Sequence, residues 1–142
     1  MRVLGIDVGR RRVGLAISDT SGTLARPLAT VTVASAADAV DRVLLEVTRL
    51  AAEDEGLSAI VVGMPARLDG GPTTETPYAA AFIDALRTHA PVPVLTEDER
   101  LTSREAESRL AVGEKDWRRR KEKLDAAAAA VILQDYLDRR TI

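Results

Sequence analysis

Carboxylates occur at three distant places in the chain where they could act together on a phosphodiester bond. Asp7 lies within an apolar run, residues 97–99 are three adjacent acids, and Asp125 precedes five consecutive alanines. An ionised aspartate inside a buried strand is costly unless it is paired, and a divalent cation is a natural partner. Two-metal hydrolysis needs acidic oxygens from separate elements that hold Mg²⁺ or Mn²⁺ ions about 4 Å apart. One acid from each place, such as Asp7, Glu99 and Asp125, meets that need, although no single pair among them is diagnostic.

Each of these acids also has a purely structural interpretation. Asp7 could cap the turn that follows it, and Asp125 could be a first-turn residue that the helix dipole favours. Because side chains alternate along a strand, Glu97 and Glu99 share one face while Asp98 points the other way. The three could also form a charged turn before a helix, so the residue types alone leave open which of them lines a site.

Two basic clusters could bind nucleic acid, although the chain as a whole is mildly acidic. Its net charge is −2, so a polyanion has to be bound by local patches rather than by the overall charge. One patch directly follows Gly9, and residues 115–123 carry six positive and two negative charges. A tryptophan beside arginines could stack on unpaired bases while the arginines contact phosphates. Either patch could instead be solvated, with Trp117 tucked into the core. The candidate nucleic-acid-binding residues are Arg10, Arg11, Arg12, Trp117, Arg118, Arg119, Arg120 and Lys123.

The composition excludes several other kinds of site. The 142 residues include no cysteine and one histidine, which rules out disulfides, iron–sulfur clusters, thiolate zinc sites and multi-histidine metal cages. Hydrophobic residues make up 46% of the chain, enough for one core, so we expect a single domain over residues 1–142. Apolar runs fall short of the roughly 20 residues that span a bilayer, and no signal-peptide pattern opens the chain. We therefore expect a cytoplasmic protein that does not bind membranes.

The hydrophobic pattern predicts elements in the order βββ-α-β-α-β-α. Continuous or alternating apolar residues predict strands, helical spacing predicts helices, and Gly and Pro residues mark the turns. The expected strands are 2–8, 13–18, 28–33, 57–62 and 92–97; the expected helices are 36–54, 77–89 with Thr76 as N-cap, a short one at the capping box 102–105, and 122–139 after a charged linker. Strands that alternate with helices pair in parallel through right-handed crossovers. We predict an α/β, RNase H-like fold: a central five-stranded mixed sheet, antiparallel over its first three strands, flanked by helices.

Five motifs that occur in order over nearly the whole chain resemble the YqgF (RuvX) family of RNase H-like proteins. They are Gly5-Ile6-Asp7-Val8-Gly9 with Gly14, Ala25-Arg26-Pro27-Leu28, Gly63-Met64-Pro65 with Asp69-Gly70, Asp98-Glu99-Arg100-Leu101-Thr102-Ser103, and Lys123-Leu124-Asp125 followed by the alanines. Each motif is weak alone, but five in register are specific. The resemblance implies an RNase H-like fold and a nuclease that processes the 5′ end of pre-16S rRNA. Resolution of Holliday junctions is the rival activity within the same chemistry.

The resemblance also implies which residues carry the chemistry. It assigns Asp7, Glu99 and Asp125 as the catalytic acids that bind Mg²⁺ or Mn²⁺, and it selects Glu99 within the acidic triplet. Arg67 stands where family members often carry a polar amide, so the contact made by its loop is not carried over. Structured or single-stranded RNA is the favoured partner and branched DNA the alternative. A resolvase would act as a homodimer and a ribonuclease could act as a monomer. A module that binds nucleic acid without cutting it is a further alternative.

Overall fold

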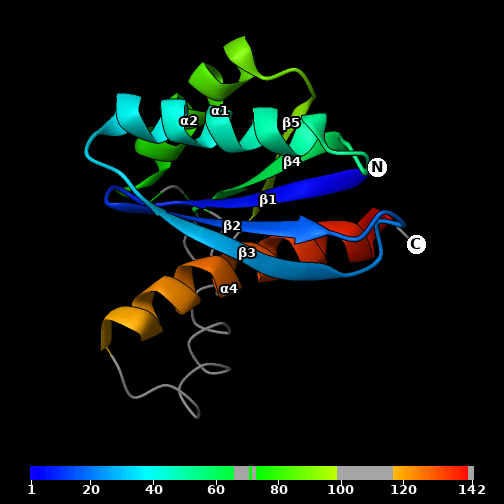
Figure 1. Cartoon of the computed structure of the whole chain (residues 1–142). Helices are drawn as coiled ribbons and strands as arrows, with labels where there is room; N and C mark the ends of the chain where they lie inside the picture. The colour runs from blue at the N-terminus through cyan, green and yellow to red at the C-terminus, as the bar shows by residue number, and fades with distance from the viewer. Residues whose placement is uncertain (66–70, 72, 99–116, 141–142) are drawn as a thin grey trace.

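The chain folds into a five-stranded sheet with helices on both faces. The computed structural model describes residues 1–65, 71, 73–98 and 117–140, with the backbone alone over 117–123. The elements are β1 (Arg2–Val8), β2 (Arg12–Ser18), β3 (Ala25–Thr32), α1 (Ala36–Ala52), β4 (Leu57–Met64), α2 (Thr76–His89), β5 (Val94–Asp98) and α4 (Trp117–Arg140). Helices α1 and α2 cover one face of the sheet and α4 covers the other (Figure 1). The short helix expected at 102–105 lies outside the described residues.

The strand order confirms the predicted mixed sheet. The strands lie in the order β3-β2-β1-β4-β5. The β1–β2 and β2–β3 pairs are antiparallel, whereas β4 pairs in parallel with both β1 and β5. Two hairpin-like connections therefore precede two helical crossovers, as the change from strand-only to alternating elements indicates. The carboxyl ends of β1, β4 and β5 meet at one edge of the sheet, where α/β proteins commonly bind ligands.

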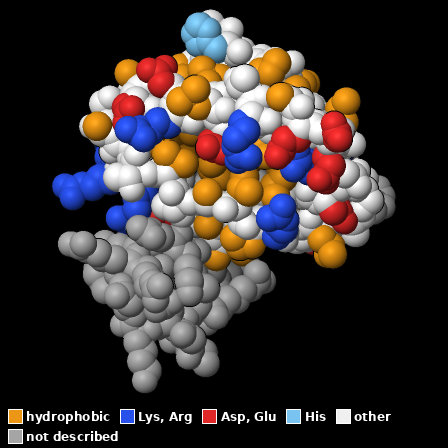
Figure 2. Space-filling model, in the orientation of Figure 1, with side chains coloured by type: hydrophobic (Ala, Val, Ile, Leu, Met, Phe, Trp, Pro, Cys, Tyr) orange, Lys and Arg blue, Asp and Glu red, His pale blue; other side chains and the backbone are white. Residues whose placement is uncertain are grey.

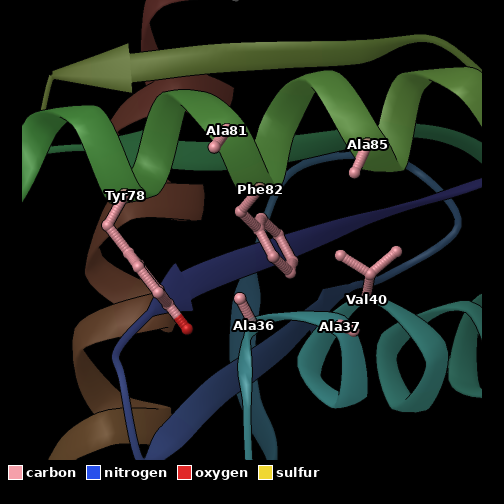
Figure 3. Close-up of a pocket in the computed structure, with 7 residues that line it drawn as sticks. All are labelled: Ala36, Ala37, Val40, Tyr78, Ala81, Phe82 and Ala85. Atoms are coloured by element: carbon pink, nitrogen blue, oxygen red, sulfur yellow. The ribbon is translucent and has the colours of Figure 1, made fainter.

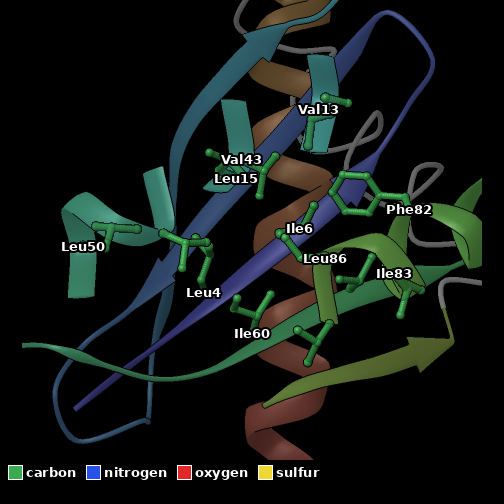
Figure 4. Close-up of a cluster of buried hydrophobic side chains, with 14 of the residues drawn as sticks. Leu4, Ile6, Val13, Leu15, Val43, Leu50, Ile60, Phe82, Ile83 and Leu86 are labelled. Carbon is green, nitrogen blue, oxygen red and sulfur yellow. The ribbon is translucent and has the colours of Figure 1, made fainter. Parts of the chain in front are cut away.

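The two faces of β1 belong to two different cores. Leu4 and Ile6 pack towards α1 and α2 in the larger cluster, part of which is drawn in Figure 4. Val3 packs towards α4 in the smaller cluster with Ala129 and Leu133. Successive side chains of a strand point to opposite faces, so β1, buried on both sides, has to be apolar almost throughout. The nearly continuous apolar run of β1 is the sequence signal for this central position.

Helix α4 begins five residues earlier than the sequence pattern predicts. We expected a charged linker before residue 122, but the helix starts at Trp117. Arg, Lys and Glu are strong helix formers, and no Gly or Pro interrupts residues 117–122. The basic segment therefore continues the helix rather than preceding it.

The predicted starts of α2, β3 and β5 also differ from the observed ones. Thr76 is not the N-cap of α2: Glu75 is, without a side-chain cap. The Thr76 hydroxyl instead accepts from the Thr73 N–H at 2.8 Å and donates to the Pro65 carbonyl at 2.8 Å. Strand β3 starts three residues early, since an edge strand tolerates Pro27 beside a register shift. Strand β5 starts at Val94, after Pro93, which has no N–H to donate.

A buried arginine ties the start of β1 to the end of α1. The Arg2 Nε donates to the Gly56 carbonyl at 3.2 Å, and Nη2 donates to the Leu50 carbonyl at 3.2 Å and to Glu53 Oε1 at 2.9 Å. We expect Arg2→Met to lower the free energy of unfolding by about 2 kcal/mol, because it leaves buried carbonyls without a donor. Urea unfolding followed by circular dichroism measures this.

The matched control for Arg2→Met is Arg42→Met, which removes an ion pair with Asp38 on the exposed side of α1. Its effect is expected to be much smaller, since solvent screens an exposed pair. Equal losses in the two variants would contradict a special role for the buried Arg2.

Candidate active site

Two glycines let α4 lie directly against the sheet. A Cβ at Gly5 would lie 2.7 Å from the Cβ of Leu133 and 3.0 Å from the Ala129 carbonyl oxygen. A Cβ at Gly14 would clash with the backbone carbonyl of Asp125. Any other residue at Gly14 would have to push the helix away, since side chains and backbone here are close-packed. The glycine of β2 therefore fixes how closely Asp125 approaches the sheet.

The same glycine brings Asp7 and Asp125 to one place. Asp7 pairs with Gly14 across the β1–β2 ladder. Directly opposed residues have Cα atoms about 5 Å apart and side chains on the same face. Because Gly14 faces the Asp125 backbone, the Asp7 side chain lies on the α4 face beside Asp125. Two acidic residues that are 118 positions apart in the sequence thus lie on the same face, both next to Gly14.

An arginine from the β1–β2 turn region is paired with Asp125. The Arg12 Nε donates to Asp125 Oδ2 at 2.7 Å, and the two side chains are 31% and 26% exposed. Arg12 lies two residues before Gly14 in β2, so both face α4. The sequence did not predict this contact, because nothing in it distinguished Arg12 from Arg10 and Arg11.

The three arginines of the turn region have different surroundings. Arg10 donates from Nε to Glu75 Oε2 at 3.0 Å, and its guanidinium lies 4.7 Å from the centre of the Tyr78 ring. The side chain of Arg11 is exposed. Arginine side chains gather at the end of the molecule where β1 turns into β2 (Figure 2). This end therefore offers positive charge next to the two carboxylates, as nucleic-acid binding requires.

The second basic cluster is described only by its backbone. Trp117, Arg118, Arg119, Arg120 and Lys123 lie in the first turns of α4, and their side chains are outside the described part. Their contacts with nucleic acid stay a prediction. Their position is relevant, since the helix that carries them leads directly into Asp125.

Glu97 of the acidic triplet lies on the same face of the sheet as Asp7. The β1–β4 ladder pairs Ile6 with Val62, so Asp7 is level with Gly63, which pairs with Glu97 in β5. Two strand spacings then separate Glu97 from Asp7, about 10 Å. Glu97 is 5% exposed, and its Oε1 lies 2.6 Å from the Arg139 Nη1 of α4. Glu99 lies outside the described residues, so its assignment stays a prediction.

The environment of Glu97 favours its neutral form. Burial raises the pKa of the Glu97 carboxyl above its ordinary value of 4.5, and the carboxylates of Asp135 and Asp98 raise it further. The Arg139 guanidinium opposes this shift without cancelling it. Glu97 is thus more costly to ionise in the folded chain than in the unfolded one.

We expect Glu97 to contribute stability that is lost as the pH rises. With its pKa raised on folding, the folded state binds the proton more tightly, so this contribution is complete below about pH 4.5 and disappears through the raised value. Glu97→Gln lacks this titration. Urea unfolding in EDTA from about pH 4 to about pH 7 should show the wild type losing stability relative to Glu97→Gln. The quantity to follow is the free energy of unfolding of the wild type minus that of Glu97→Gln. Asp38 and Asp19, whose pKa values are lowered, act in the opposite direction in both proteins, so their effect cancels in this difference. A difference that rises with pH would contradict the expectation.

An apolar groove of about 170 Å³ lies on the other face of the sheet, between α1 and α2 (Figure 3). Tyr78 and Phe82 line it together with alanines and Val40. Asp7 and Asp125 lie on the α4 face, so this groove is not part of the same site. Among the described helices, none is long and apolar enough to cross a membrane.

The donor atoms at the site fit a hard divalent cation. Asp7 and Asp125 supply carboxylate oxygens, which Mg²⁺ and Mn²⁺ prefer. Within the described residues no group of three or more acidic, histidine or cysteine side chains is assembled. The third predicted acid, Glu99, is outside that part. The described pair is therefore a partial ligand set of the right chemistry.

The arrangement of the sheet and helices is that of an RNase H-like protein. The chain superposes on Thermus thermophilus RuvC, solved in complex with a Holliday junction substrate, with a TM-score of 0.57 over 99% of this chain and 96% of that one. The two sequences are 22% identical, so this comparison establishes the fold.

The family follows from comparison of sequences. Residues 1–139 match the model of the RuvX family, described as Holliday junction resolvase. Relatives named "Putative pre-16S rRNA nuclease" include one from Chloroflexus aggregans, 42% identical over 97% of this chain and 94% of that one. Another, from Anaeromyxobacter sp. (strain K), is 41% identical over 99% and 98% of the two chains. The chain belongs to the RuvX family, a family of nucleases, as the five motifs predict.

Proposed function

We propose that residues 1–142 form one divalent-metal-dependent nuclease domain that processes the 5′ end of pre-16S rRNA in the cytoplasm, during ribosome biogenesis. One observation carries the proposal: the Asp7–Gly14 register and the contact of Gly14 with α4 gather Asp7 and Asp125 beside a basic turn. The choice of substrate is supported by the names of relatives that match nearly the full chain.

The residues of the chain have separate roles in this activity. Asp7 and Asp125 would hold Mg²⁺ or Mn²⁺ together with Glu99. When bound, such ions activate water and offset the charge that develops on the phosphate. Gly14 sets the separation of the two described carboxylates, because it fixes α4 against β2. The exposed Arg11 would contact the phosphates that flank the cleaved bond, a sequence-independent interaction.

A second candidate function is cleavage of branched DNA. The description of the family model as Holliday junction resolvase favours it. A resolvase places two active sites symmetrically on two strands, so this activity requires a homodimer. The same acids would serve either substrate.

One experiment separates these functions. Labelled pre-16S 5′-leader RNA and a synthetic four-way DNA junction are each incubated with the protein in Mn²⁺ or in EDTA. We expect cleavage of the RNA that EDTA abolishes, and an intact junction. Symmetric nicking of the junction alone would reverse the assignment. Binding of either substrate without any product would instead identify a non-catalytic module.

A further inference from the structure

Asp125 already has a cationic partner in the described structure. The Arg12 guanidinium holds Asp125 Oδ2 at 2.7 Å, and each side chain is about one-third exposed or less. The half-buried setting makes this charge pair stronger than an exposed one. A cation that binds Asp125 therefore meets a positive group at the same carboxylate.

The position of Arg12 also relieves the repulsion between the two acids. Asp7 and Asp125 lie near each other on the α4 face, and two negative charges close together repel each other. A single guanidinium beside them offsets part of that charge. A divalent cation would offset it more fully and would leave the guanidinium without an anionic partner at Asp125.

We propose that Arg12 is the resident counter-ion of Asp125: it neutralises this carboxylate before metal binds, competes with the metal for it, and is released towards the substrate phosphate when metal arrives. The inference rests on the proposed function in that Asp125 is taken as a metal ligand. It makes Arg12 a positioning residue that acts through Asp125. Binding of the metal and binding of nucleic acid then favour each other, because each of them breaks the Arg12–Asp125 ion pair.

The neighbouring arginines do not share this role. Arg10 is paired with Glu75 and lies over Tyr78, and the Arg11 side chain is exposed. Arg11 therefore provides a matched control, since its removal takes away the same charge one position along the chain.

The test is the affinity of the metal-free protein for Mn²⁺, measured by calorimetry in the absence of nucleic acid. We expect Arg12→Met to bind Mn²⁺ about tenfold more tightly than the wild type, the equivalent of losing one charge-assisted hydrogen bond that competes. Arg11→Met should stay within about twofold of the wild type, because solvent screens its exposed charge. Unchanged or weaker Mn²⁺ binding by Arg12→Met would overturn the proposal, and weaker binding would make Arg12 a group that orients Asp125 for the metal.

A second variant and a second readout keep the test decisive. If Arg12→Met does not fold, Arg12→Lys keeps the charge but loses the planar fork, and it should still bind Mn²⁺ more tightly than the wild type. Thermal unfolding should show that Mn²⁺ raises the Tm of the Arg12 variant more than that of the wild type. Neither measurement uses a nucleic acid. Tighter Mn²⁺ binding by Arg12→Met, with no cleavage of either substrate by the wild type, would refute the proposed nuclease and support the counter-ion role. Cleavage by the wild type, with no tighter Mn²⁺ binding by Arg12→Met, would refute the counter-ion role alone.

Discussion

Replacing Asp7 with asparagine is expected to abolish metal-dependent cleavage while the protein stays folded. The side chain keeps its size but loses the charge that binds a cation. Loss of a metal ligand removes several kcal/mol of charge stabilisation, and each 1.36 kcal/mol is a factor of ten, so a decrease of about 10³-fold or more in kcat is expected. Single-turnover cleavage of the RNA substrate in Mn²⁺ measures it.

The matched control for Asp7→Asn is Asp41→Asn, which makes the same change at an exposed position of α1. It should cleave at the wild-type rate. Both variants should unfold as cooperatively as the wild type. Full activity in Asp7→Asn would refute the assignment of this residue, and equal losses in both would point to a general effect of charge.

The second large effect is expected at Gly14, where alanine should damage both stability and activity. Its methyl group would meet the carbonyl of Asp125, which belongs to the helix backbone and cannot rotate away. Overpacking of this kind costs about 3 kcal/mol when the neighbour cannot yield. Helix α4 and Asp125 would have to move off the sheet, so cleavage should fall even under conditions where the variant is folded. Urea unfolding and cleavage assays on the same preparation measure the two effects.

Gly22 is a suitable control for Gly14→Ala. It lies in the turn after β2 with a φ of 69°, and a Cβ there would have no atom within 4 Å. Gly22→Ala should cost about 1 kcal/mol through its backbone conformation and leave cleavage unchanged. A stable, fully active Gly14→Ala protein would contradict the close contact of α4 with β2.

The central strands could be predicted because their burial dictates their composition. Both faces of β1 are covered, so Val3, Leu4 and Ile6 had to be apolar, and the run from 2 to 8 matches the observed strand. The start of β3 could not be predicted, because β3 is an edge strand and its composition at Arg26 and Pro27 is not dictated by burial. The start of α4 was not predicted for another reason. The high charge of residues 117–122 was interpreted as a linker, and the strong helix propensity of Arg, Lys and Glu was not considered.

The sequence singled out Asp7 and Asp125 as candidate acids but did not predict the partner of Asp125. Asp7 stood out as a charge within a buried strand, and Asp125 as an acid directly before five alanines. The pairing of Arg12 with Asp125 joins residues 113 positions apart. No local pattern reveals which of three consecutive arginines reaches a distant carboxylate. The signal that could have found it is strand alternation, which places Arg12 on the face of Gly14, two residues on.

The order of synthesis of the chain determines when α4 can pack on the sheet. Every described strand precedes residue 99, whereas Asp125 arrives on a helix that begins at residue 117. Until that helix docks, Val3, Ala16 and Val61 lack the cover that α4 gives them on their side of the sheet. A nascent chain on the ribosome therefore holds Asp7 long before it gains Asp125. Under the proposed function, cleavage would therefore begin only after α4 has been synthesised and has packed on the sheet.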